Sequence, residues 1–244
     1  MAIVEYDGTD FQGFQIQARK RTVQGELERA LRKITGEKIR VIGAGRTDTG
    51  VHASGQGAHF DTTWARSIAE LQRALNAVLP NDIAIRTLVQ VADDFSARYS
   101  AQSRTYRYTI LNQAIRSPLA ARYALVVPEP LDADAMNAAA RCLIGTHDFG
   151  AFGTPPHGEN TVREIHRAQV TRAGNRVLIE IEANAFLYRM VRRIVGTLLL
   201  VGKGALNIEQ FREVLAKQRR AGQSVPPQGL CLIEVKYGVT DENI

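Results

Sequence analysis

The spacing of apolar residues alternates along the chain between two patterns, and each pattern predicts one kind of element. Spacings of three and four residues indicate amphipathic helices, whereas strict alternation indicates half-buried strands. Helices are expected at residues 23–34, 68–78, 132–144, 186–203 and 208–218. Strands are expected at 2–6, 38–44, 56–60, 82–91, 104–111, 123–127, 165–171, 176–183 and 230–237. Strands and helices are therefore mixed along the whole chain.

The order of these elements predicts an α+β fold. The first hundred residues read β-α-β-β-α-β, and Ser67 with Glu70 forms a capping box at the start of the second helix. We expect two ferredoxin-like or RRM-like α+β halves, an N-terminal one at 1–100 and a C-terminal one at 101–244. Their antiparallel sheets are expected to merge around a central active-site cleft, since layers packed in this way leave a concave site.

Composition favours a soluble globular protein. Hydrophobic residues make up 45% of the 244 positions and charged residues 23%, which are ordinary values for a folded domain. The longest apolar stretch, 197–201, is far too short to cross a bilayer, and the acidic start lacks the pattern of a signal peptide. We therefore expect a cytoplasmic protein without a membrane segment. Cys142 and Cys231 lie in apolar runs without CxxC spacing, which favours buried thiols over a metal site or a disulfide.

Positive charge modestly favours a nucleic-acid partner. Lys and Arg exceed Asp and Glu by six, and the predicted pI is 9.5. The basic residues cluster at 19–21, 29–33, 38–46, 189–193 and 212–220. Such clusters suit a polyanion, because each neutralised phosphate releases condensed counterions. A solvated basic surface is the alternative.

The glycine-rich segment 43–50 presents one carboxylate beside one guanidinium. It lacks the glycine spacing of a dinucleotide-binding loop and the Gly-Lys-Ser/Thr of a Walker loop. With those excluded, Asp48 next to Arg46 is a candidate nucleophile or base. The alternative is an aspartate that caps a glycine turn, which is common in proteins.

Two further patterns add candidate partners. Alternation puts Arg104, Tyr106 and Tyr108 on one face of a strand, which suits base stacking as well as an ordinary core. The 186–203 helix is apolar nearly all round, so it is expected to be largely buried. Arg192 and its neighbouring arginines would then lie near a buried surface, where a guanidinium needs a partner such as Asp48 or RNA phosphate. A polar helix face remains the alternative.

The segment 45–53, Gly-Arg-Thr-Asp-Thr-Gly-Val-His-Ala, resembles the signature of the tRNA pseudouridine synthase A family. This signature is highly specific, and the resemblance covers nearly the whole chain. Further matching segments are 5–8, 13–15, 23–24, 55–56, 59–60, 95–98, 104–108, 147–149, 184–187, 190–192, 194–196 and 229–230. Phe14 stands where the family usually has Trp, and Thr49 where it usually has a small residue or Lys.

The resemblance implies an isomerase that converts uridine to pseudouridine at positions 38, 39 and 40 of the tRNA anticodon arm. It implies a homodimer that uses no cofactor and no metal. Asp48 takes the place of the family's essential aspartate, Tyr106 of its substrate-stacking tyrosine, and Arg46 and Arg192 of its active-site arginines. Asp48 would either attack C1′ or remove the C2′ proton.

Three alternatives differ from this interpretation. A noncatalytic RNA-binding protein would also be basic with aromatic residues on a sheet, but it would not need Asp48. A nucleotide enzyme would need a phosphate loop or a metal constellation, and neither is found in the sequence. Another pseudouridine synthase would share the aspartate and differ in the target site.

Overall fold

The computed structural model describes residues 1–238, which form two compact units. The first unit contains residues 1–102 and the last strand, and the second contains residues 103–230. The sequence predicts a division near residue 100 that leaves the last strand in the second half. The last strand instead belongs to the first unit, because Cys231 and Leu232 pair with His52 and Ala53.

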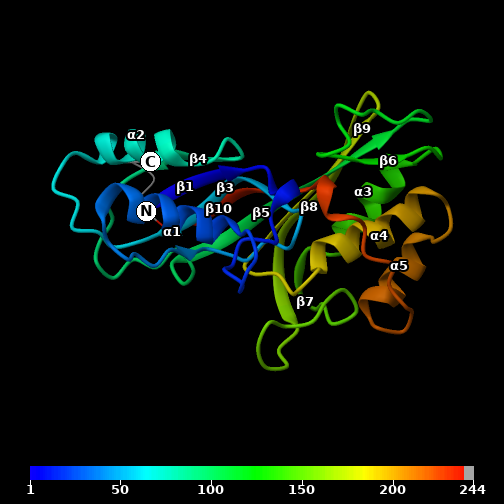
Figure 1. Ribbon diagram of the computed structural model, residues 1–244. Coiled ribbons are helices and arrows are strands. Elements are labelled where there is room, and N and C mark those ends of the chain that lie inside the picture. The colour runs from blue at the N-terminus through cyan, green and yellow to red at the C-terminus, as the bar shows by residue number, and fades with distance from the viewer. Residues whose placement is uncertain (239–244) are drawn as a thin grey trace. The chain divides into compact units, whose positions relative to one another are not determined.

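The first unit is a sheet covered by two helices (Figure 1). Its strands in spatial order are β4 (Ile83–Leu88), β1 (Ala2–Tyr6), β3 (His52–His59) and β10 (Leu230–Tyr237). The short strand β2 (Ile42–Gly43) also pairs with β3, and every pairing except that of β10 is antiparallel. The order β4-β1-β3-β2 with β-α-β-β-α-β connectivity is the predicted ferredoxin-like arrangement.

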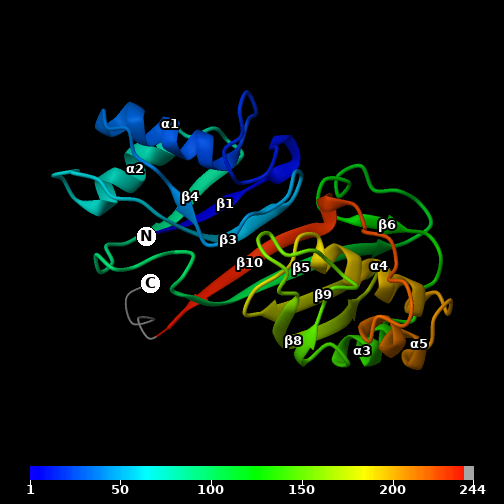
Figure 2. The same cartoon turned by 90° about the horizontal axis from the view of Figure 1, so that it is seen from below.

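The two helices of this unit begin and end at residues that the sequence marks. Helix α1 (Val23–Thr35) is capped by the Thr22 side chain and ends at Gly36, whose φ is 78°. Helix α2 (Ile68–Val78) begins with the predicted capping box of Ser67 and Glu70. The helices contact each other and lie over one face of the sheet (Figure 2). Their buried leucines form the core with apolar side chains of the strands: Val4, Leu27, Leu31, Leu75 and Ile85.

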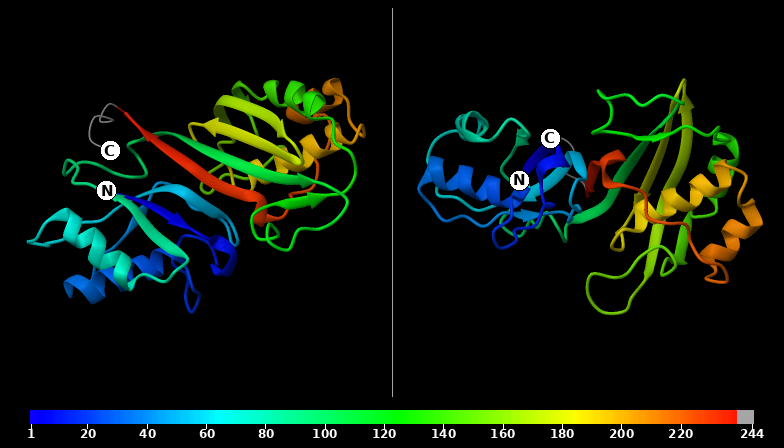
Figure 3. Two further views of the ribbon diagram at one scale, coloured as in Figure 1. Left: turned by 90° about the horizontal axis from the view of Figure 1, so that it is seen from above. Right: turned by 45° about the vertical axis from the view of Figure 1, so that its right-hand side comes forward.

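The second unit is an antiparallel sheet with three helices. Its strands in spatial order are β5 (Ala101–Asn112), β9 (Arg176–Ala183), β8 (Val162–Ala173) and β7 (Gly145–Asp148), and β6 (Leu125–Val127) pairs with β5 in parallel. The helices are α3 (Ala133–Arg141), α4 (Met190–Gly202) and α5 (Ile208–Leu215). They gather on one side of the sheet (Figure 3). The α+β class predicted from the sequence is confirmed in both units.

Two expected elements differ clearly from the structure, and one strand lies where none was expected. The strand expected at 38–44 is only Ile42–Gly43, and β7 follows the third helix where no strand was expected. The helix expected from 186 begins at Met190, because Arg189 has a φ of 61° and Tyr188 forms a bridge to Thr154 instead. Helix α4 is buried on nearly every side, as predicted.

Neither Cys142 nor Cys231 forms a disulfide, as predicted, but both are half-buried where the sequence predicts buried thiols. No helix within residues 1–238 combines the length and the apolar character needed to cross a membrane.

Candidate active site

Asp48 lies in the segment that joins β2 to β3, and we call residues 44–51 the aspartate loop. The amide of Ala44 at its start donates to the Gly57 carbonyl at 2.7 Å, and the amide of Val51 at its end donates to the Asp48 carbonyl at 3.1 Å. Gly50 completes this closing turn with a φ of 77°, which favours glycine. Asp48 is half-buried in a tight turn, whereas Arg46 is exposed.

Residues 11–21, which precede α1, lie against one side of the aspartate loop, and we call them the bracketing segment. Gly50 donates its amide to the Phe11 carbonyl at 3.3 Å, and Phe14 donates its amide to the Thr47 carbonyl at 3.1 Å. Between them, Gly13 has a φ of 83°, and a β-carbon there would lie 2.7 Å from the Thr47 oxygen. The chain therefore needs glycine at 13 for both its conformation and its space.

Buried polar side chains tie the other side of the loop to the sheet. The Tyr6 hydroxyl lies 2.8 Å from the Thr47 hydroxyl, and Gln56 donates from Nε2 to the Gly45 carbonyl at 3.1 Å. Gln56 Nε2 also lies 3.5 Å from the Tyr6 oxygen. Burial raises the pKa of Tyr6, so its hydroxyl stays protonated across the physiological range. Residues 45 and 47, on either side of Arg46, are thus fixed.

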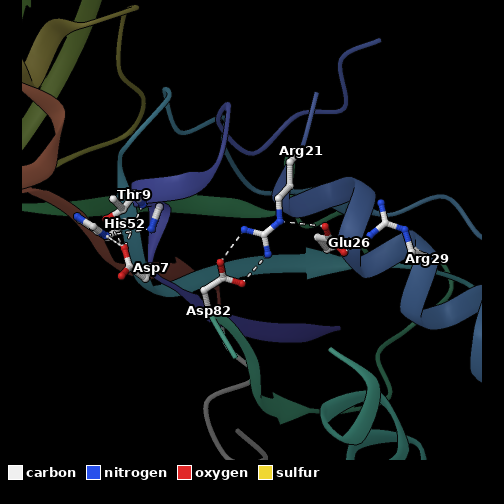
Figure 4. A network of polar contacts seen from close by, with 8 residues as sticks. Asp7, Thr9, Arg21, Glu26, Arg29, His52 and Asp82 are labelled. Carbon is white, nitrogen blue, oxygen red and sulfur yellow. Dashed lines mark hydrogen bonds and ion pairs between the residues drawn. The ribbon is translucent and has the colours of Figure 1, made fainter. Parts of the chain in front are cut away.

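A histidine holds the point where the loop becomes β3. The Gly8 amide donates to Nδ1 of His52 at 3.0 Å, and Oδ1 of Asp7 lies 3.2 Å from the same nitrogen (Figure 4). Nδ1 can accept from Gly8 only when it carries no proton, and it can donate to Asp7 only when it carries one. A β-carbon at position 8 would lie 2.0 Å from the Val51 carbonyl oxygen.

Arg21 fastens the bracketing segment to the rest of the first unit. Its two terminal nitrogens donate to the Asp82 carboxylate at 2.7 and 2.8 Å, and its Nε donates to Glu26 at 3.2 Å (Figure 4). The guanidinium lies 4.1 Å from the centre of the Phe11 ring. Because the Phe11 carbonyl accepts from Gly50, this ion-pair network reaches the aspartate loop through one residue.

In the second unit, Tyr106 and Tyr108 lie on the same face of β5, as alternation predicts. Tyr106 is 9% exposed, and its ring meets the Phe186 ring edge to face with centroids 5.1 Å apart. Tyr108 is fully buried and donates its hydroxyl to the Pro226 carbonyl at 2.8 Å. The core interpretation therefore holds for Tyr108. Tyr106 forms an aromatic pair with Phe186, a contact that the sequence does not predict.

Arg192 is half-buried near Tyr108 in the first turn of α4. Its Nε donates to the Val225 carbonyl at 2.7 Å, and the Val225 amide donates back to the Arg192 carbonyl at 3.2 Å. Burial raises the pKa of Tyr108, and the positive charge of Arg192 opposes that rise. The sequence predicts Asp48 or RNA phosphate as the partner of this guanidinium, and a backbone carbonyl is one partner it has. Arg189 is exposed and lies over the Tyr188 ring.

Phe14 and Thr49, the two departures from the family pattern, lie in different environments. Phe14, which stands where the family usually has Trp, is 3% exposed and packs against Gly43, where a β-carbon would lie 2.5 Å from the ring. Thr49 is exposed. Within residues 1–238, no group of three or more His, Cys, Asp or Glu side chains is arranged to hold a metal ion.

Known proteins match this chain over almost its whole length. The family model described as tRNA pseudouridine synthase matches residues 2–100 and 139–238. A tRNA pseudouridine synthase A of Brevibacillus brevis is 45% identical over 96% of this chain and 98% of its own length. Proteins of the same name from Roseiflexus sp. and Chloroflexus aurantiacus are 46% and 48% identical, and the matches cover 98% and 96% of this chain and 92% and 87% of theirs.

A solved Cbf5-Nop10-Gar1 complex contains a chain with 12% identity and a TM-score of 0.36, covering 83% of this chain and 55% of that one, which is too weak to support an inference. The family model and the relatives do not depend on it. The chain belongs to the tRNA pseudouridine synthase family.

Proposed function

We propose that this protein converts uridine to pseudouridine at positions 38, 39 and 40 of the tRNA anticodon arm, with Asp48 as the catalytic residue. Membership of the family supports the general statement that the protein is an isomerase acting on tRNA. The anticodon-arm target and the role of Asp48 are the further steps. The observation that carries them is the aspartate loop, whose sequence matches the family signature and whose backbone is fixed on both sides of Asp48.

The reaction requires a carboxylate that stays in one position while the uracil rotates. The N1–C1′ bond breaks, the uracil rotates, C5 bonds to C1′, and the proton that leaves C5 is balanced by one that N1 gains. Asp48 starts this sequence either by attacking C1′ or by removing the C2′ proton. In both routes its carboxylate must lie within bonding or hydrogen-bonding reach of the ribose, which favours a rigid loop.

The target base has to leave its stack, at a cost of a few kcal/mol. Tyr106 supplies an aromatic side chain already fixed by the edge-to-face contact with Phe186, and stacking on such a ring compensates for the lost base contacts. Arg46 is exposed beside Asp48 and suits the space that the base vacates or a nearby phosphate. Arg192 stays a proposed active-site arginine of the second unit.

That Asp48 of the first unit acts on the same uridine as Tyr106 and Arg192 of the second stays a prediction, as do the homodimer and the cytoplasmic location. The basic clusters support a tRNA partner, because net charge of +6 favours association with a polyanion.

The test uses unmodified tRNA transcripts with uridine at positions 38–40 and matched transcripts with cytidine there. Pseudouridine is mapped by carbodiimide-blocked primer extension after incubation with the wild-type protein, Asp48→Asn and Asp94→Asn. Asp94 is an exposed aspartate of the same unit and controls for the loss of one negative charge. We expect stops at 38–40 with the wild type and Asp94→Asn and none with Asp48→Asn.

Three results would contradict the proposal. Primer-extension stops elsewhere in the tRNA would be consistent with an isomerase but would contradict the target at positions 38–40. Undiminished stops with Asp48→Asn would remove Asp48 from the chemistry. Binding of tRNA without any pseudouridine would favour the noncatalytic RNA-binding alternative.

A further inference from the structure

Three buried polar side chains join the aspartate loop to the sheet, and each comes from a different segment. Tyr6 ends β1, Thr47 lies in the loop, and Gln56 lies in β3. Their exposed fractions are 3%, 5% and 0%. Hydrogen bonds join Tyr6 to Thr47 and Gln56 to the Gly45 carbonyl, and the longer contact of 3.5 Å links Gln56 to Tyr6.

The chemistry of these groups fixes the donor in the hydrogen bond between Gln56 and the loop. The Gly45 carbonyl only accepts, so the amide of Gln56 must turn its nitrogen toward the loop. The same nitrogen lies 3.5 Å from the Tyr6 oxygen, and the Tyr6 and Thr47 hydroxyls share a hydrogen bond of 2.8 Å in which either can be the donor. The three residues form one connected network from the sheet to the loop.

Gln56 is a costly choice for a core position. Its Oε1 is buried and finds no hydrogen-bond donor among residues 1–238, and an unsatisfied buried acceptor destabilises a fold. Gln24 gives the contrast, because it is equally buried yet its oxygen accepts from Ile16 and its nitrogen donates to Glu28 and Val41. An apolar side chain of similar length would fill the site of Gln56 without that cost. What Gln56 supplies in exchange is the bond to the loop backbone.

We propose that Tyr6 and Gln56 are positioning residues for the proposed isomerisation. They fix the backbone at residues 45 and 47, so that Asp48 is already in place when the uridine arrives. This inference rests on the proposed function of the aspartate loop. Neither side chain touches substrate in this account, and both act through the loop.

Small displacements of a reacting group have large effects, since an error of about 1 Å costs on the order of a hundredfold in rate. Releasing one tether lets the loop sample more positions without removing Asp48. We therefore expect Tyr6→Phe and Gln56→Met to lower the single-turnover rate constant at least tenfold. The dissociation constant for tRNA should stay within about twofold, because neither side chain is exposed to RNA.

Tyr237→Phe is the matched control. Tyr237 belongs to the same unit, is 7% exposed and donates its hydroxyl to the Ala97 carbonyl at 3.1 Å, in a segment other than the aspartate loop. Like Tyr6→Phe, the Tyr237→Phe variant loses a tyrosine hydroxyl that is buried and hydrogen-bonded. We expect a melting temperature comparable to that of Tyr6→Phe and a rate constant within twofold of the wild type. Thr47→Val removes the hydrogen-bond partner of the Tyr6 hydroxyl, and we expect it to slow turnover in the same way.

Hydrogen–deuterium exchange of the protein alone tests the same inference without any tRNA. The amides of Gly50 and Val51 are hydrogen-bonded within and beside the loop, and their exchange should accelerate about tenfold in Tyr6→Phe and Gln56→Met but not in Tyr237→Phe. Unchanged exchange would overturn the inference even if the wild type is an active synthase. A wild type that makes no pseudouridine, with accelerated exchange in the variants, would refute the proposed function and not the tethering. Equal slowing of turnover by Tyr6→Phe and Tyr237→Phe would also overturn the inference.

Discussion

Replacing Gly13 by Ala separates two physical demands on the segment that brackets the aspartate loop. Gly13 has a φ of 83°, and an added β-carbon would lie 2.7 Å from the carbonyl oxygen of Thr47. Gly36, at the end of α1, has a similar φ of 78° but nothing within 4 Å of the added carbon. The pair therefore shares the conformational strain and differs in the steric contact.

The magnitudes follow from these two terms. An alanine in the left-handed region costs about 1–2 kcal/mol, offset by about 0.4–1 kcal/mol because alanine restricts the unfolded chain. Gly36→Ala should then destabilise by about 1 kcal/mol. Gly13→Ala adds the contact with Thr47, and overpacking of this kind costs roughly 1–3 kcal/mol. Its total of about 2–4 kcal/mol lowers the melting temperature by on the order of 10 °C, at about 2–4 °C per kcal/mol.

The decisive assay combines thermal melting with turnover at a temperature where both variants are folded. Relief of the contact at position 13 requires the Thr47 backbone to move, and Thr47 directly precedes Asp48. Gly13→Ala should therefore lose at least tenfold in turnover, whereas Gly36→Ala should keep the wild-type rate. Equal melting temperatures and equal rates for the two variants would refute the reasoning, because the contact with Thr47 would then have no effect.

Three further predictions concern other contacts. Arg192→Leu should lower turnover far more than tRNA affinity, and equal losses would mean that Arg192 mainly holds phosphate. Tyr108→Phe removes the hydrogen bond to Pro226 and should cost about 0.5–1.5 kcal/mol of stability, measured by urea unfolding; an unchanged urea midpoint would count against that bond. Hydrogen bonds from Lys217, Thr161 and the Gly150 amide hold the pKa of Asp148 at about 2, below its usual 3.8. Its contribution to stability is therefore present above about pH 4 and is lost as the pH falls toward 2, so Asp148→Asn should flatten the acid limb of a melting-temperature profile. A limb as steep as that of the wild type would mean that Asp148 is not its source.

The helices and most strands were predictable from the sequence because local signals mark them. The capping box of Ser67 and Glu70 and the stop at Gly36 were read correctly, since both depend on neighbouring residues only. The start of α4 was not, because Arg189 adopts a positive φ where the preceding residue bridges to Thr154. That bridge joins residues far apart in the chain, and no local pattern reports it.

In the candidate site, too, the sequence predicts what depends on neighbouring residues and not what depends on residues far apart in the chain. The loop motif points to Asp48 and Arg46 directly, whereas the matching segments 5–8 and 55–56 include Tyr6 and Gln56 without indicating that they contact the loop. Tyr6 reads as an ordinary strand residue, and its partner Thr47 lies 41 positions later. The membership of β10 in the first unit was missed for the same reason, because its pairing with β3 spans the whole second unit.

That pairing sets an order of events during synthesis on the ribosome. The strand β3 carries Gly55 and Gly57, whose missing side chains leave room for Ile233 and Tyr237 of β10. Domains generally fold as units and from the N-terminus during synthesis, yet here the first unit lacks one of its strands until the entire second unit has been made. Until then residues 52–53 of β3 lack their partner strand and present an unpaired edge of the kind that invites pairing with other chains. The aspartate loop, which leads directly into β3, reaches its final surroundings only when the last strand arrives.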